Sequence, residues 1–215
     1  MSISHEKLGN VYLKLGRTEE ALQRYQDAFK ISERLANDDP DDTGMQRDLS
    51  VSHNNLGHLY LELGRTEEAL RRYRDGIKIR ERLAREDPND TRKQRELSTS
   101  HLLLGDLCLK LGRTQEVLQH YQDGMKISEQ LAQDDPTDSL TQSCLILFHY
   151  KVGNIHFENE DIAKSEASFV KGVAVLDQTI ANGKNIEQHQ SIRRSLQAGI
   201  AKCKSAQEMD EPDEE

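Results

Sequence analysis

Four of the eight histidines recur at a fixed interval, and a catalytic or metal-binding function would have to be built from them first. His5, His53, His101 and His149 follow one another at steps of 48 residues. Such a period is typical of a repeat protein, in which equivalent side chains lie on helices stacked about 8–10 Å apart. Metal–nitrogen bonds are about 2 Å long, so these histidines cannot share one ion. We interpret them as structural residues whose titration near neutrality would make stability depend on pH.

No other motif predicts catalysis. The sequence has no His-Glu-x-x-His metal motif and no glycine-rich phosphate loop. Cys108, Cys144 and Cys203 have neither disulfide nor metal spacing, and an odd number of scattered cysteines fits a reducing compartment. We therefore expect a cytoplasmic protein that is not an enzyme and that uses no metal and no cofactor.

The composition argues against nucleic acid and membranes as partners. No stretch approaches the roughly 18 apolar residues of a membrane span. The formal net charge is −9, but much of it lies on residues 208–215, so the rest of the chain is close to neutral. The arginine-rich second repeat is balanced by acids, with Glu67–Arg71 and Glu68–Arg72 at the spacing of helical ion pairs.

Each repeat is predicted to form two helices of about 20 residues, at about 44–63 and 66–87 in the second repeat. Thr43 and Gln46 have the spacing of a capping box, which recurs one and two repeats later. Gly64 is expected to end the first helix in the left-handed conformation, and Thr66 to cap the second. Pro88 then terminates that helix.

The residues that recur between repeats form one frame. In the second repeat this frame is His53-x-x-Leu56-Gly57-x-x-Tyr60, then Ala69-x-x-x-Tyr73, then Pro88. It resembles the tetratricopeptide repeat, with histidine in place of the usual tryptophan, and it is similar to the long-repeat form of bacterial multi-domain proteins. The resemblance implies an all-α fold, a right-handed TPR-like superhelical solenoid of antiparallel helix pairs with a C-terminal capping helix.

The same frame divides the chain into segments. The fourth repeat is degenerate, because Glu160 replaces the turn glycine and Ser165 replaces the alanine. The expected segments are repeat 1 at 1–42 with a truncated first helix, repeat 2 at 43–90, repeat 3 at 91–138, degenerate repeat 4 at 139–185, a capping helix at 186–207 and an acidic disordered tail at 208–215.

The resemblance also implies where a partner would bind, because the first helix of each pair lines the concave groove in this family. The corresponding positions vary between repeats, polar in the first two and apolar toward the fourth. One alternative is that the apolar end packs under the capping helix instead. A carboxylate clamp is not expected, since only Asn10 matches one. The candidate protein-binding residues are Asn10, Arg47, Asn54, His58, Leu61, Arg95, Leu102, Asp106, Leu109, Leu147, Tyr150, Asn154 and Phe157.

Three functions remain open at this point. The first is a non-catalytic scaffold that binds a peptide or helix of another protein in the groove. The second is a regulatory or sensor segment of a larger bacterial signalling protein. The third is a structural array, self-assembling through its end repeats or engineered from them.

Overall fold

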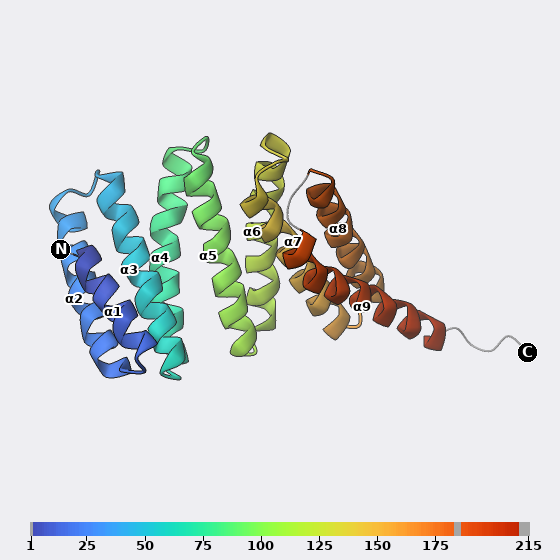
Figure 1. Cartoon of the computed structure of the whole chain (residues 1–215), viewed down its shortest axis with the longest axis horizontal. Helices are drawn as coiled ribbons and strands as arrows, with labels where there is room; N and C mark the ends of the chain where they lie inside the picture. The colour runs from blue at the N-terminus through green and yellow to red at the C-terminus, as the bar shows by residue number, and fades with distance from the viewer. Residues whose placement is uncertain (1, 183–185, 211–215) are drawn as a thin grey trace, which may run out of the picture. The chain divides into compact units, whose positions relative to one another are not determined.

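The computed structural model describes residues 2–182 and 186–210, and these residues form nine helices and no strand (Figure 1). The helices are α1 (Ser2–Lys14), α2 (Thr18–Asp38), α3 (Thr43–Glu62), α4 (Thr66–Glu86), α5 (Thr91–Lys110), α6 (Thr114–Asp134), α7 (Ser139–Glu158), α8 (Ile162–Ala181) and α9 (Ile186–Asp210). From α3 onward, equivalent helices begin 48 residues apart. The two predicted helices of the second repeat end within a residue of their expected limits.

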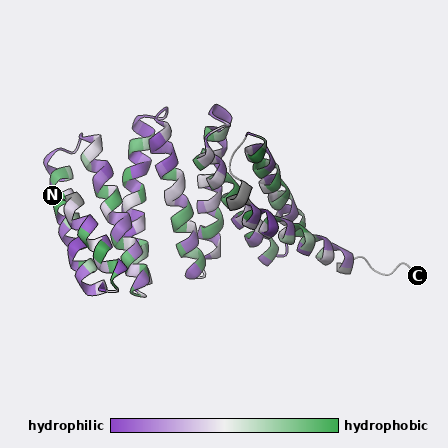
Figure 2. Cartoon of the chain, in the orientation of Figure 1, coloured by the Kyte–Doolittle hydropathy of each residue, from purple (hydrophilic) through white to green (hydrophobic). Residues whose placement is uncertain are grey.

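The chain divides into two compact units, Met1–Arg113 with α1–α5 and Thr114–Glu215 with α6–α9. In the first unit each helix packs against the next one along the chain. In the second unit α6, α7, α8 and α9 pack in the same way, and α9 also contacts α7. Hydrophobic and hydrophilic residues alternate along the helices (Figure 2), as expected where one face of each helix is buried. Within the described ranges, no helix is long and apolar enough to cross a membrane.

The helix caps differ from the predicted capping boxes. Asp42, one residue earlier than expected, is the N-cap of α3, and its carboxylate accepts from the Met45 amide at 2.9 Å. Gln46 does not reach back to the cap but donates to the main-chain oxygen of Ala36 at 2.8 Å. Aspartate also caps α5 and α7. The prediction was wrong because aspartate precedes each threonine or serine and is at least as good a cap, which places the hydroxyl residue inside the helix.

The turn between α3 and α4 follows the prediction at Gly64 and departs from it at Thr66. Gly64 has φ 71°, the left-handed conformation that glycine adopts without strain. The N-cap of α4 is Arg65, not Thr66, and it makes no side-chain cap hydrogen bond. Instead, its guanidinium lies 4.5 Å from the Tyr60 ring and pairs with Glu68 at 2.7 Å. The expected pair Glu68–Arg72 is therefore replaced by a contact across the turn.

The expected pair Glu67–Arg71 is likewise replaced. Glu67 pairs with Arg113, in the next such turn, at 3.1 Å. Arg72 lies over the Phe29 ring of α2, 4.4 Å from its centre. These contacts join neighbouring repeats, whereas the predicted pairs would have stayed within one helix.

Glycines of the repeat frame allow aromatic rings to press against the helix backbone. A Cβ on Gly57 would lie 3.1 Å from the Tyr73 ring, so the ring packs directly on α3. In the second unit Phe169 lies between two helices, and a Cβ on Gly153 of α7 or on Gly199 of α9 would approach it to 2.6 Å. Close packing of this kind requires that no side chain be present at these positions.

Helix α9 covers the end of the second unit. Leu196 and Cys203 are fully buried in a cluster with Ile146, Phe169 and Leu176. The helix continues to Asp210, so the predicted boundary between capping helix and tail at residue 207 was three residues too early. Alanine, glutamine and glutamate near this end are good helix formers, which explains the extension. The rest of the expected tail, 211–215, lies outside the described residues.

Candidate functional site

The thirteen candidate binding residues divide between the two units. Those of the second unit all lie on α7: Leu147, Tyr150, Asn154 and Phe157. Those of the first unit lie on its odd-numbered helices: Asn10 on α1, Arg47, Asn54, His58 and Leu61 on α3, and Arg95, Leu102, Asp106 and Leu109 on α5.

Three of the candidates come together in a cleft of about 380 Å³ in the first unit. The cleft lies between α3 and α5, with α4 contributing to its lining. We call it the α3/α5 cleft, and its lining residues are His58, Leu61, Glu62, Tyr73, Leu103, Asp106, Leu107 and Lys110.

The inner surface of the α3/α5 cleft is apolar and rigid. Tyr73 is buried and held against Gly57, and burial raises the pKa of its hydroxyl to about 12, so the ring stays neutral. Leu107 is also buried, and Leu103 is half-buried. These side chains offer a hydrophobic contact to an entering group without needing to rearrange.

Charged and polar side chains surround this apolar surface. The imidazole of His58 is 3.7 Å from the Glu62 carboxylate, and both side chains are exposed. Asp106 and Lys110 stand on α5. The arrangement of an apolar centre and a polar edge is that of a binding surface for a peptide or helix.

The remaining first-unit candidates lie outside this cleft. Asn10 accepts a hydrogen bond from the Tyr25 hydroxyl at 2.7 Å. Leu102 is buried, whereas Leu109 is 43% exposed. Arg47 and Arg95 are both half-buried. Asn54 is half-buried beside Gly76 of α4.

The candidates on α7 are largely engaged within the second unit. Tyr150 and Phe157 pack against the cluster that contains the α9 residues Leu196 and Cys203. Tyr150 also lies 6.2 Å from the ring of Phe169. These contacts favour the alternative in which the apolar end packs under the capping helix. The other two, Asn154 and Leu147, are half-buried, and Asn154 donates to the Tyr150 main-chain oxygen at 2.9 Å.

The sequence analysis missed cleft residues that lie one turn from those it selected. Glu62 follows His58 by four residues on α3, while Leu103 precedes and Lys110 follows Asp106 on the same face of α5. The spacing of three and four residues was a usable signal, because such residues share a helix face.

The repeated histidines are packing residues in this structure. His53, His101 and His149 are buried, and the His53 ring meets Phe29 edge-on at 4.9 Å. Burial lowers the pKa of His53 to about 4, with Arg72 lowering it further and Asp75 opposing. Burial and Lys171 lower the pKa of His149 to about 4 as well. Both rings are therefore neutral near pH 7.

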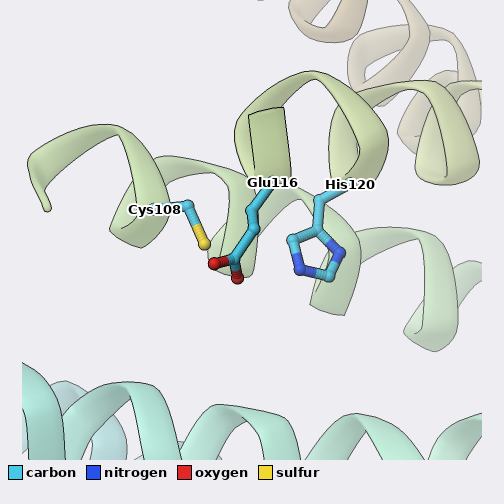
Figure 3. Close-up of side chains that lie close together, drawn as sticks. All are labelled: Cys108, Glu116 and His120. Atoms are coloured by element: carbon cyan, nitrogen blue, oxygen red, sulfur yellow. The ribbon is translucent and has the colours of Figure 1, made fainter. Parts of the chain in front are cut away.

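Figure 3 shows three side chains with metal-binding chemistry, Cys108, Glu116 and His120. Glu116 and His120 are one turn apart on α6, in the second unit, and Cys108 is on α5, in the first. Because these residues belong to different units, we do not combine them into a site.

The helix pairs, the turn glycines and the ring-on-glycine packing define a class of protein, the helical-hairpin repeat proteins. Residues 1–82 match the family model of the tetratricopeptide repeat. The chain is accordingly a tetratricopeptide-like repeat protein with an all-α solenoid fold and a long, 48-residue repeat. Repeats of this type generally mediate protein–protein interaction and scaffolding.

Solved structures with the same fold have low sequence identity to this chain. BtubC from P. vanneervenii is 15% identical, with a TM-score of 0.61 over 97% of this chain and 81% of that one. A putative kinesin light chain with TPR-like repeats from Podosopora anserina is 16% identical, with a TM-score of 0.63 over 96% and 87%. The yeast histone chaperone Hif1 is 12% identical, with a TM-score of 0.64 over 96% of each chain. No curated protein matches the sequence significantly.

Proposed function

We propose that this chain is a non-catalytic scaffold that binds a peptide or helix of another protein in the α3/α5 cleft. The observation that carries the proposal is the cleft itself, an apolar surface edged by charges. The residues at its edge are not part of the repeat frame, since His58 and Asp106 are replaced by asparagine at Asn10 and Asn154. Hif1, which shares the fold, is described as a scaffold protein recruiting protein complexes to core histones.

The cleft favours a particular partner chemistry. Tyr73, Leu103 and Leu107 would contact one apolar side chain of the partner. Glu62 and Asp106 would attract a lysine or arginine beside that apolar residue. The thiol state of all three cysteines favours a reducing compartment, and we place this function in the cytoplasm.

Peptides selected from a display library against the whole protein would test the proposal. Their affinity is measured by calorimetry for the wild type and for Leu61→Ala and Asp106→Asn. We expect each change to weaken binding about tenfold, because it removes a contact at the centre or edge of the cleft.

The matched control is Lys78→Ala on α4, whose side chain is 73% exposed and does not line the cleft. It should leave affinity unchanged. Equal binding by the wild type and both cleft variants would refute the assignment of the cleft as the binding site.

A second candidate function, self-association, is favoured by one face of α1. Leu8 and Val11 are 39% and 50% exposed. Their equivalents on α3, Leu56 and Leu59, are buried beneath the preceding helix α2. The same face of α1 therefore presents an apolar strip of the kind that elsewhere joins two repeats, and a second copy could cover it.

Light scattering across protein concentration tests this candidate. If the strip joins two copies, the mass should rise with concentration for the wild type and stay that of a monomer for Val11→Asp. The control is Val170→Asp on α8, where the valine is equally exposed at 49%, and it should behave as the wild type. A wild type that remains monomeric at every concentration would eliminate self-association.

A further inference from the structure

A small pocket of about 50 Å³ lies in the first unit near the beginning of α3, apart from the α3/α5 cleft. We call it the basic pocket. Side chains from α3, α4 and α5 line it, and four of them are cations, accompanied by one carboxylate. The lining residues are Thr43, Gly44, Arg47, Arg80, Leu83, Arg92, Lys93 and Glu96.

The single carboxylate of the basic pocket is already neutralised. Glu96 accepts two hydrogen bonds from Arg47, at 2.7 Å from Nε and 2.6 Å from a terminal nitrogen. Lys93 is compensated outside the pocket, by Asp87 at 3.2 Å and Asp90 at 3.8 Å. The positive charge that remains comes from Arg80 and Arg92.

Arg80 is an unusual residue to find in this place, because it is only 8% exposed. Among the described residues its hydrogen-bond acceptors are all uncharged: the hydroxyls of Ser50 and Ser100, the main-chain oxygen of Glu96 and the amide oxygen of Asn54. Burial lowers the pKa of its guanidinium below the ordinary value, Glu96 raises it and Arg47 lowers it. A buried cation whose contacts are all neutral is unfavourable unless an anion compensates it.

The repeat frame does not require an arginine here. The equivalent residues one repeat away on either side are Ser32 and Ser128, and the next is Leu176. Arg92 also has no basic equivalent, since Gly44 and Leu140 occupy the same position in the repeats before and after. Both cations are therefore specific to this junction, although the same helices pack without them elsewhere.

We propose that the basic pocket binds an oxyanion, the carboxylate or phosphate group of a ligand, through Arg80 and Arg92. Planar guanidinium groups bind such oxygens through paired, charge-assisted hydrogen bonds. At about 10–15 Å³ for each water-sized group, the pocket has room for about four of them, which suits a carboxylate or phosphate but not a larger molecule. The site is independent of the α3/α5 cleft, because neither arginine lines that cleft.

An NMR titration of the whole protein tests the proposal with inorganic phosphate in one arm and acetate in the other. Sodium chloride at equal ionic strength corrects for general screening. We expect saturable shifts of the Arg80 and Arg92 side-chain signals in at least one arm, and the arm with higher affinity identifies the preferred oxyanion. No saturable shift in either arm would overturn the proposal.

Variants then locate the site. Arg92→Ser removes an exposed cation, so it should preserve the fold while weakening the binding of the preferred ion about tenfold. Arg80→Met, which keeps the length of the side chain, should abolish it, and circular dichroism checks that helix content is retained. Arg71→Ser is the control, because it removes one exposed charge from α4 outside the pocket. Equal losses in Arg92→Ser and Arg71→Ser would show a nonspecific charge effect and refute the site.

Discussion

Replacing His53 with phenylalanine should remove much of the acid sensitivity of the first unit. The histidine is buried, and its Nδ1 atom has no hydrogen-bond partner among the described residues. A phenylalanine would retain the edge-on contact with Phe29. At pH 7 the change should therefore alter stability little.

The magnitude follows from the pKa of His53, which burial lowers from 6.5 to about 4. Between these values the unfolded chain carries a proton on this imidazole and the folded chain does not. Stability is therefore constant above pH 6.5, falls as the pH drops from 6.5 toward 4, and falls no further from this residue below pH 4. A shift of this size corresponds to about 3 kcal/mol in the free energy of unfolding.

Urea unfolding at pH 7 and pH 4.5, followed by circular dichroism, measures the effect. Burial raises the pKa of Glu6, which acts in the opposite direction over part of this range. The useful quantity is therefore the pH-induced loss in the wild type minus the loss in the variant, expected to be roughly 2–3 kcal/mol. His58→Phe, at an exposed histidine, is the control and should not reduce the loss. If His53→Phe loses as much stability as the wild type, burial of a neutral ring is the wrong explanation.

Three further substitutions test the local packing by thermal and urea unfolding. Glu160→Gly should stabilise the second unit by about 1 kcal/mol, because Glu160 has φ 61°; a destabilised variant would contradict the strain. Gly153→Ala should destabilise by about 1–3 kcal/mol, because the new Cβ would lie 2.6 Å from Phe169; an unchanged midpoint would mean that the ring shifts freely. Asp90→Ala should cost about 1 kcal/mol and Thr91→Ala much less, and the reverse order would restore the capping box.

The helices could be predicted from the sequence because the same local signals recur every 48 residues. Gly64 needs no tertiary information, since a left-handed turn residue is required wherever one helix ends and the next begins at once. The cap was misplaced at Thr43 because Asp42 and Thr43 are both good caps, and only the helix start decides between them. Side-chain partners were less predictable than helices, as Glu68 shows by pairing back across the turn.

The candidate site was predictable only in part, because it depends on which faces neighbouring helices leave open. Helix α3 contributes His58 and Leu61 to a cleft, as a position-by-position comparison of repeats suggested. Tyr150 has an equivalent position, but packing beside the α9 cluster half-buries it, and the direction of α9 is not encoded in the repeat. Burial of Arg80 was hidden as well, because hydroxyls from two other helices accept its hydrogen bonds. Its only signal was an arginine in a position where Ser32 and Ser128 stand.

Amide hydrogen exchange of the whole protein, with and without a display-selected peptide, tests the central claim most directly. The account predicts that the peptide slows exchange at residues 58–62 of α3 and 103–110 of α5, which line the α3/α5 cleft. The outer helix α2 of the same unit should exchange at an unchanged rate. Protection confined to α2, or spread evenly over the first unit, would contradict binding in the cleft.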